Sequence, residues 1–408
     1  MADLFWPGDE RAADAFDQGS FLESMVEVEH VWLHALVEAG VAPSTARADL
    51  RGVVTGADVE RVALGAEASG NAVVPLLTLL RERVGAENEA ATWLHRGLTS
   101  QDVLDTALVL SARATTDSLL SHLDRQVAAL STLAHRHRDD LMAGRTLTQH
   151  AVPITFGLKA AQWLQGVLDA RDDLQSLRFP VQMGGAAGTL SAAVALAGDA
   201  DAARFVVADT ARGLGLDNAA PWHTSRAPLT RYADALVGAT GAMGHIANDV
   251  LLLARPEIAE LAEPAVEGRG GSSTMPQKAN PVLSVLIRRA ALTAPGLGAQ
   301  LHLAAATAVD ERPDGSWHTE WSTLATLSRH SVTAASQTAE LLTGLHVDVA
   351  RMAALVKQQA SALTAEQRSI SVLLDSEPDA DPRHYLGAHG EIIDEVLERT
   401  RHHEQEDV

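Results

Sequence analysis

The stretch from Gly270 to Pro281, GGSSTMPQKANP, concentrates groups that can carry out acid–base and anion chemistry. Its glycines and prolines exclude a helix interior, so we expect a loop between two long apolar segments. A mobile loop of this kind can close over an anion and bring the hydroxyl of Ser273 to a reacting carbon. Lys278 and Asn280 would add a cation and an amide. The alternative is a helix–helix connection with polar filler.

A second polar group stands at the start of a predicted helix. Thr99 or Ser100 can cap a helix that begins near Gln101, with Asp102 in its first turn. Hydroxyls and free N–H groups at a helix N-terminus also form a good carboxylate site. Capping and binding can coexist here. Asn71, in a predicted turn, can cap the next helix or contact a ligand.

Four more side chains can hold or protonate an anion. Gln149 and His150 lie in the segment GRTLTQHAVP, residues 144–153. His150 can be an acid, a base, a carboxylate ligand or a merely packed side chain. Arg226 and Arg312 can each clamp a carboxylate with two parallel hydrogen bonds.

Apolar residues at steps of three and four predict that long helices carry these groups. Alanine and leucine dominate while aromatic residues make up 4%, which favours closely packed helices over sheets. The expected fold class is therefore all-α, with helices over about 105–137, 155–177, 281–306 and 317–343. The glycine-rich segment 179–189 lacks the GxGxxG spacing and the strand–loop–helix setting of a nucleotide site.

Composition and net charge argue against several classes of binding partner. The chain has 408 residues, no cysteine and a formal net charge of −21. This charge argues against nucleic acid or an anionic membrane as a partner. No signal peptide and no transmembrane run are visible, so we expect a cytoplasmic protein. His135 and His137 fall on different helix faces, and we expect no metal and no cofactor.

The segment GSSTMPQKANP resembles the GSSxMPxKxNP signature of the fumarase/aspartase superfamily. The resemblance implies that Ser273 removes or delivers the proton next to a carboxylate, and that Lys278 and Asn280 hold substrate carboxylates. The stretch from Thr99 resembles the superfamily's TSxDxxDT motif, whose Thr-Ser pair binds substrate. The region of Asn71 also touches substrate in this superfamily.

The segment from Gly144 is similar to the superfamily's GRTHxQxAxP motif, with one departure. Leu147 occupies the place of the usual histidine, and His150 follows three residues later. This form resembles the bacterial 3-carboxy-cis,cis-muconate cycloisomerases, and so does the WHxEW pattern that follows Arg312. The resemblance implies that Gln149 contacts substrate and that His150 replaces the missing acid or binds a carboxylate.

The resemblance also implies an architecture. It predicts three helical domains (1–104, 105–345 with the signature loop at 268–281, and 346–408) and a homotetramer whose core is a bundle of long helices. Each active site would draw the regions 95–106, 144–153 and 270–281 from three different subunits.

The implied substrate is a small polycarboxylate. A cycloisomerase would add the substrate's own carboxylate to a double bond, through an aci-carboxylate carbanion that receives a proton from Ser273. The alternatives are a lyase that releases fumarate from a substituted succinate, with an amine-bearing molecule or nitrite leaving, and a helical structural protein that has lost activity. Intact Ser273, Lys278 and Asn280 weigh against the last.

Overall fold

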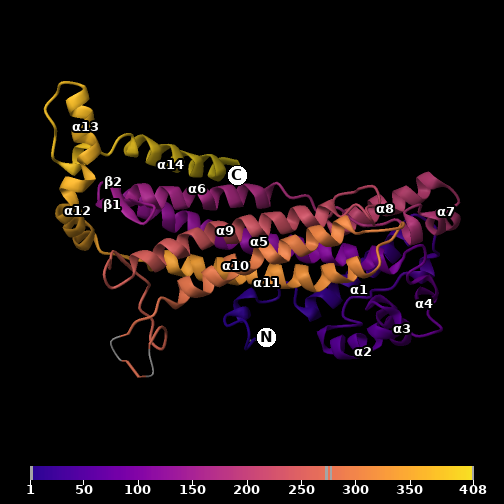
Figure 1. The fold of residues 1–408 in the computed structure, drawn as a ribbon. Coiled ribbons are helices and arrows are strands. Elements are labelled where there is room, and N and C mark those ends of the chain that lie inside the picture. Colours follow the sequence, from indigo (N-terminus) through magenta and orange to yellow (C-terminus); the bar gives the residue numbers. More distant parts are fainter. Residues whose placement is uncertain (1–2, 272–273, 276–277, 407–408) are drawn as a thin grey trace. The chain divides into compact units, whose positions relative to one another are not determined.

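A computed structural model of the chain describes residues 3–271, 274–275 and 278–406. Its regular structure is mostly helical, as the sequence predicts (Figure 1). The α-helices are α1 (Gln18–Glu38), α2 (Val59–Ser69), α3 (Val73–Val84), α4 (Glu89–Trp93), α5 (Ser100–Arg136), α6 (Phe156–Gln175), α7 (Ser191–Ala197), α8 (Ala200–Leu214), α9 (Ala227–Leu253), α10 (Val282–Ala306), α11 (Gly315–Thr343), α12 (Val349–Leu363), α13 (Ala365–Leu373) and α14 (His389–Glu406). Short 3₁₀ turns lie at Asp9–Ala12, Ser44–Ala46, Gly56–Asp58, Gly185–Ala187 and Pro382–His384.

The long helices form where the apolar periodicity predicts them. In α5, Leu119, Leu123, Leu130 and Leu133 are buried and Val127 is half-buried. These positions recur at steps of three and four, so they lie on one face of the helix. The sequence therefore predicts α5 correctly, except that the helix begins slightly earlier, at Ser100.

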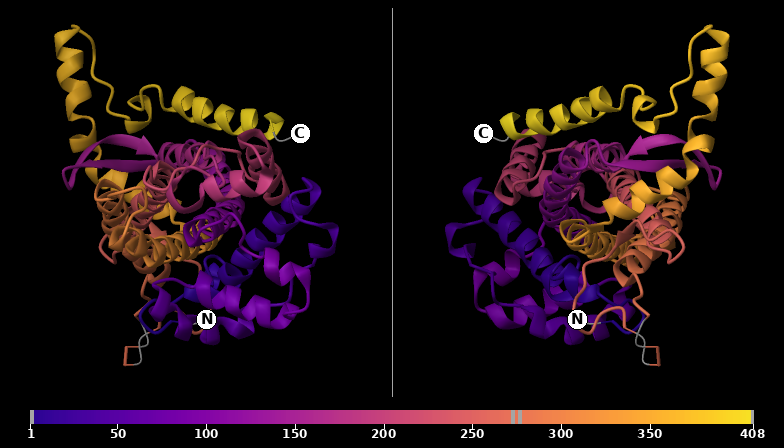
Figure 2. Two further views of the ribbon diagram at one scale, coloured as in Figure 1. Left: turned by 90° about the vertical axis from the view of Figure 1, so that its right-hand side faces the viewer. Right: turned by 90° about the vertical axis from the view of Figure 1, so that its left-hand side faces the viewer.

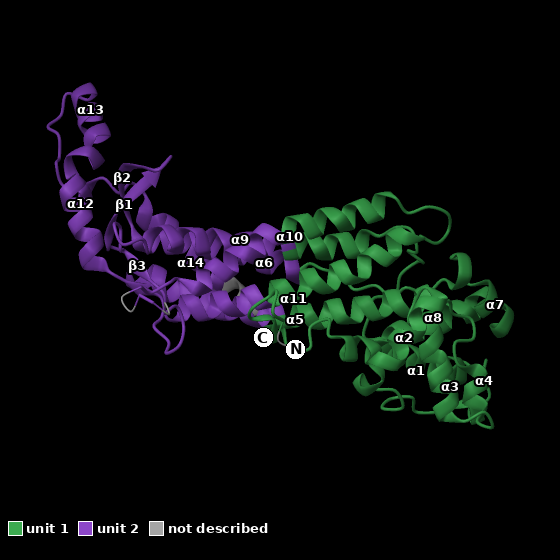
Figure 3. Cartoon of the chain, turned by 60° about the horizontal axis from the view of Figure 1, so that its bottom comes forward, with its two compact units in different colours: residues 1–118, 176–236, 294–332 green, residues 119–175, 237–293, 333–408 purple. Residues whose placement is uncertain are grey.

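The chain divides into two compact units, coloured separately in Figure 3. Unit 1 comprises residues 1–118, 176–236 and 294–332, and unit 2 comprises residues 119–175, 237–293 and 333–408. Helices α5, α9, α10 and α11 each give one part to each unit. The expected three-domain division stays a prediction.

Unit 2 contains an antiparallel hairpin where the sequence analysis expects no strand. Strand β1 (Leu141–Thr146) pairs with β2 (Gln149–Thr155) through a two-residue turn, Leu147 and Thr148, whose φ angles are 48° and 70°. Asparagine and glycine are the usual residues in such a turn, so this sequence gives no hairpin signal. A second small pair joins β3 (Leu261–Ala262) to β4 (His346–Val347).

The hairpin packs on α12, as both views in Figure 2 show. Ala143 of β1 forms a small core with Val356 and Leu363 of α12. The ladder is irregular at Gly144, where a Cβ would lie 2.7 Å from the carbonyl oxygen of Val152. Only glycine fits there without a shift of the backbone.

Within the part of the chain that the structure describes, two helices are long and apolar enough to be compared with membrane spans. By length and composition α9 and α10 pass that test, with half and a third of the most apolar window buried, respectively. Core helices of soluble proteins pass the same test, so it is weak support for a membrane span.

Candidate active site

Thr99 stands at the N-terminus of α5 in unit 1, where the sequence predicts a cap. Its backbone N–H donates to Asp102 Oδ2 at 2.9 Å. The same carboxylate accepts hydrogen bonds from the backbone N–H groups of Gly184 (2.8 Å) and Gly185 (3.0 Å), and Asp102 is fully buried. Asp102 therefore ties the glycine-rich loop to the turn that carries Thr99 and Ser100.

Arg312 meets Thr99 directly. Its Nη1 donates to Thr99 Oγ1 at 2.9 Å, and its guanidinium lies 5.3 Å from the ring centroid of Trp317. The indole N–H of Trp317 donates to Asp105 at 2.8 Å, which fixes the ring. A guanidinium has five N–H donors, so this half-buried arginine retains donors for an anion. The structure thus brings together two residues that lie 213 positions apart.

Arg226 is already bound to carboxylates of the protein. It donates to Asp105 at 2.6 and 3.0 Å and to Glu320 at 3.0 Å, and its side chain is fully buried. Burial alone lowers the pKa of Arg226, but the two carboxylates outweigh it and raise the pKa above its ordinary value. Burial raises the pKa of Glu320, although Arg226 opposes this shift. The role of Arg226 as a substrate clamp stays a prediction, and this geometry favours a positioning role.

Asn71 holds the turn before α3. Its Oδ1 accepts from the N–H of Val73 at 3.0 Å, and its Nδ2 donates to the carbonyl of Ser69 at 3.1 Å. His318 Nε2 lies 2.9 Å from the carbonyl oxygen of Gly70, so α11 contacts the same turn. Ala72 occupies the N-cap position of α3, and Asn71 before it accepts from the first helical N–H, so Asn71 stabilises the start of the helix from one position earlier than a cap. Its contact with substrate remains a prediction.

Gln149 and His150 lie at the hairpin tip in unit 2. Both are exposed, and Leu147 in the turn is 95% exposed. The only hydrogen bond described for the Gln149 side chain joins it to its neighbour Thr148 at 3.4 Å. Two side chains of the predicted chemistry, those of Gln149 and His150, are therefore exposed at the surface of this chain.

Ser273 lies outside the described residues, but both ends of its loop are described. Glu263 accepts from the N–H groups of Leu283 (3.0 Å) and Ser284 (2.6 Å) at the start of α10. Asn280 donates through its backbone N–H (2.8 Å) and its Nδ2 (2.9 Å) to the carbonyl of Gly270. These contacts close the base of the loop.

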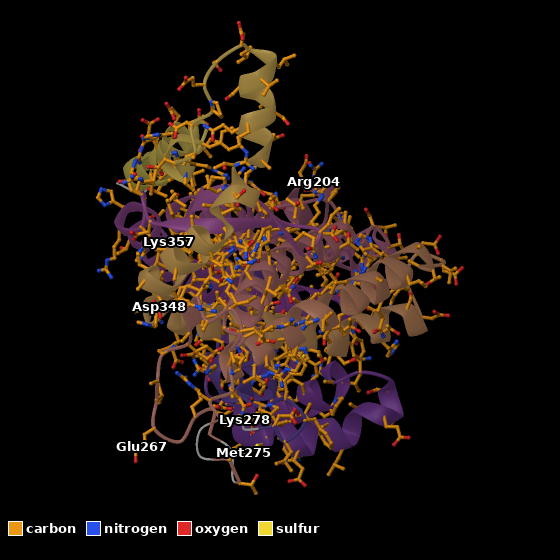
Figure 4. The ribbon with its side chains drawn as sticks, turned by 60° about the vertical axis from the view of Figure 1, so that its left-hand side comes forward. Arg204, Glu267, Met275, Lys278, Asp348 and Lys357 are labelled. Carbon is orange, nitrogen blue, oxygen red and sulfur yellow. The ribbon has the colours of Figure 1, made fainter. Side chains whose placement is uncertain are left out.

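The side chain of Lys278 is exposed on this loop, where Figure 4 labels it together with Glu267 and Met275. A pocket of about 520 Å³ adjoins the loop base, and Arg269, Glu263 and Asn280 contribute to its lining. Arg269 is held by an ion pair with Glu340.

The roles of three acidic residues in these clusters were not expected from the sequence. Asp105 and Glu320 are the carboxylates that hold Arg226, and Asp102 organises the glycine-rich loop. The signal for Asp105 was available, because this acidic residue lies between Leu104 and Ala107 in a mostly apolar part of the helix. Among the described residues, no group of three or more His, Asp or Glu side chains could hold a metal ion.

Comparison with known proteins identifies the family. The model of the family described as Lyase matches residues 11–296. The chain is 46% identical over 352 residues to a nitrosuccinate lyase from Streptomyces davaonensis, covering 83% of this chain and 73% of that protein. It is 40% identical over 345 residues to a 3-carboxy-cis,cis-muconate cycloisomerase from Bradyrhizobium diazoefficiens, covering 83% and 75%.

A solved structure agrees with these relatives. The 3-carboxy-cis,cis-muconate lactonizing enzyme from Pseudomonas putida superposes with a TM-score of 0.83 at 31% identity, covering 96% of this chain and 97% of that one. The all-α fold expected from the sequence is thereby confirmed. The chain belongs to the lyase family and is an enzyme of the fumarase/aspartase superfamily.

Proposed function

We propose that this enzyme is a 3-carboxy-cis,cis-muconate cycloisomerase that forms a carboxymuconolactone in protocatechuate breakdown. The observation that carries the proposal is the likeness to a lactonizing enzyme along 96% of the chain. The sequence at the hairpin supports it, since Leu147 replaces the histidine usual in the eliminating lyases and His150 follows.

The reaction is internally balanced. A carboxylate oxygen of the substrate adds to the conjugated double bond, a C–O bond forms, and the electron pair of the double bond moves to the carbon next to another carboxylate. That carbon then takes a proton, which we assign to Ser273. The product is an isomer of the substrate, so no cofactor or second substrate is needed.

The aci-carboxylate of the intermediate carries two negative charges and sets the electrostatic requirement. Fixed cations and N–H donors must face the charge that develops on the carboxylate. Lys278 and Asn280 supply these groups from the signature loop in this proposal, and His150 supplies a further acid or carboxylate ligand. Thr99, Ser100 and Arg312 hold the remaining carboxylates at the N-terminus of α5.

We further propose a homotetramer whose active sites are shared between copies. The exposed tip of the hairpin supports this arrangement, because Leu147, Gln149 and His150 lie at the surface of a single chain. Helix α10 adds an apolar face, on which Val285, Leu292 and Leu303 are 52%, 73% and 60% exposed. Large exposed apolar side chains along one helix are typical of protein interfaces.

A fumarate-releasing lyase is the second candidate, and a specific observation favours it. The nitrosuccinate lyase from Streptomyces davaonensis is 46% identical, more than the cycloisomerase from Bradyrhizobium diazoefficiens. In such an elimination Ser273 would remove the proton next to a carboxylate, and nitrite or an amine-bearing group would leave with the electron pair. This reaction also forms a carbanion next to a carboxylate, so the same side chains can stabilise it.

Two parallel absorbance assays on the purified enzyme distinguish the candidates. The first follows the loss of the conjugated absorbance of 3-carboxy-cis,cis-muconate. The second follows fumarate formation from nitrosuccinate, adenylosuccinate and argininosuccinate. Turnover of the muconate without fumarate is the expected result. Fumarate with the muconate untouched would replace the first proposal by the second, and inactivity in both assays would contradict both.

A further inference from the structure

The strand that precedes the hairpin tip carries a buried charge. Arg145 lies opposite His150 in the β1–β2 register, and its side chain is only 14% exposed. Its Nη1 donates to Glu260 Oε2 at 2.9 Å and to the carbonyl of Ala143 at 3.2 Å. The residue across the ladder from His150 is therefore fixed from outside the hairpin.

Glu260 depends on this arginine. Its carboxylate is fully buried, and Oε1 has no hydrogen-bond partner within the described part of the chain. A buried carboxylate without a cation is strongly disfavoured, so Arg145 and Glu260 must stay together to keep either in place. The contact is thus costly to open, unlike an exposed ion pair.

The backbone around Glu260 is anchored at two helix ends. Its N–H donates to the carbonyl of Leu253 at the end of α9 (2.9 Å), and its carbonyl accepts from the N–H of Asp348 just before α12 (3.0 Å). Arg351 of α12 donates to the carbonyls of Ile258 (2.8 Å) and Glu257 (2.7 Å). Figure 4 labels Asp348 at the start of α12. The backbone of Glu260 is therefore held in place between the end of α9 and the start of α12.

Three residues further along the chain, Glu263 closes the base of the signature loop against α10. Segment 257–263 thus holds the hairpin on one side, through Arg145, and the loop base on the other. We propose that the Arg145–Glu260 ion pair is a positioning link that sets the hairpin tip relative to the base of the signature loop within each copy of the chain. The ion pair has this effect whether the hairpin tip and the signature loop of one chain serve the same active site or active sites in different copies.

This inference rests on the proposed function, because the hairpin and loop are given their catalytic roles there. Arg145 touches no reacting atom and acts through the placement of His150 and the loop. Misplacement of catalytic groups by about 1 Å lowers turnover on the order of 100-fold. Substrate binding depends on other contacts as well, so it changes less. Loss of the link should therefore lower kcat and leave KM nearly unchanged.

The test compares Arg145→Met with the double variant Arg145→Met, Glu260→Met. The single variant leaves a buried unpaired carboxylate and should lose both stability and kcat. The double variant removes both charges and should recover wild-type thermal stability. Its kcat should still be about 10- to 100-fold below wild type, with KM within about threefold. Arg145→Lys, which keeps a cation, should recover part of the kcat.

The matched control is Arg171→Met. Arg171 is also buried, with a side chain 10% exposed, and pairs with Asp124 between α6 and α5 in the same unit. The Arg171→Met variant should have a lower stability and a kcat within about threefold of wild type. The proposal is overturned if the double variant recovers kcat together with stability, or if Arg171→Met loses kcat equally.

Hydrogen exchange separates this inference from the proposed function. In Arg145→Met, amides in peptides covering 141–155 and 257–264 should exchange about tenfold faster, and those of α14 should not change. This readout needs no substrate. If the wild-type enzyme turned over none of the substrates above, the proposed function would fail, and unchanged exchange in both peptides would independently overturn the positioning link.

Discussion

The candidate site residues of unit 1 and unit 2 differ in how completely their own chain holds them. In unit 1, Thr99, Arg226 and Arg312 have hydrogen bonds to distant parts of the unit, and Asn71 is hydrogen-bonded within its own turn. In unit 2, Gln149, His150 and Lys278 are exposed. The unit 1 side chains are held in place without a ligand or partner, whereas the unit 2 side chains lie at the surface of the chain.

This difference matches two tasks of the proposed active site, the binding of carboxylates and the transfer of a proton. A fixed set of donors at the N-terminus of α5 is suited to holding carboxylates that keep their charge during the reaction. Proton transfer needs groups that reach the reacting carbon, and in the proposed mechanism these groups come from the exposed hairpin tip and from the signature loop. We therefore expect substitutions in unit 2 to reduce turnover and substitutions in the buried network of unit 1 to reduce stability.

The largest effect should come from Ser273→Ala. Without the serine hydroxyl the proposed proton donor is missing, so kcat should fall at least about 1,000-fold while the fold is kept. Steady-state assays of the purified variant measure this, with circular dichroism as the check on folding. Ser272→Ala is the matched control and should keep kcat within about tenfold. A Ser273→Ala enzyme with unchanged turnover would remove the mechanism.

The next effect concerns stability and the buried arginine of unit 1. Arg226→Met leaves Asp105 and Glu320 buried without their cation, so the free energy of unfolding should fall by about 3–5 kcal/mol. Urea denaturation followed by circular dichroism gives this quantity. Arg312→Met should change it by less than about 1 kcal/mol and instead raise KM, because Arg312 is only half-buried. Equal losses of stability in the two variants would erase the distinction between these arginines.

The smallest effect is a pH dependence in the same network. Burial raises the pKa of Glu320 above its ordinary value of 4.5, so the folded chain binds this proton more tightly than the unfolded chain. Glu320 thus stabilises the fold at low pH, and that contribution is lost as pH rises above 4.5. Glu320→Gln does not titrate there.

The free energy of unfolding of Glu320→Gln, minus that of the wild type, should therefore increase with pH. Urea unfolding at a series of pH values from about 4 to 8 measures this difference. A difference that decreases with pH would mean that ion pairing with Arg226, rather than burial, governs this carboxyl.

The sequence could predict the helices and the polar motifs because both are local. Steps of three and four locate α5 and α11, and hydroxyls before Gln101 locate a helix start. Contacts between residues that lie far apart in the sequence produce no local pattern from which they could be predicted. Arg226 meets Asp105 and Glu320, which lie 121 and 94 positions away, so its motif alone suggested a substrate clamp.

The hairpin shows a second limit. Leu147 and Thr148 adopt positive φ angles without the asparagine or glycine that usually signals such a turn. The hairpin is held by packing on α12 and by the Arg145–Glu260 pair, and the local sequence reveals neither contact.

In the proposed oligomer, the exposed side chains of unit 2 complete active sites built with other copies of the chain. Mixing two inactive variants tests this proposal. His150→Ala and Lys278→Met chains carry different tags, are unfolded together in equal amounts and refolded, and the doubly tagged oligomer is isolated and assayed. If each site takes its hairpin and its loop from different copies, about a quarter of the sites regain both groups and activity returns to that level. Doubly tagged oligomers with no recovered activity would contradict the claim.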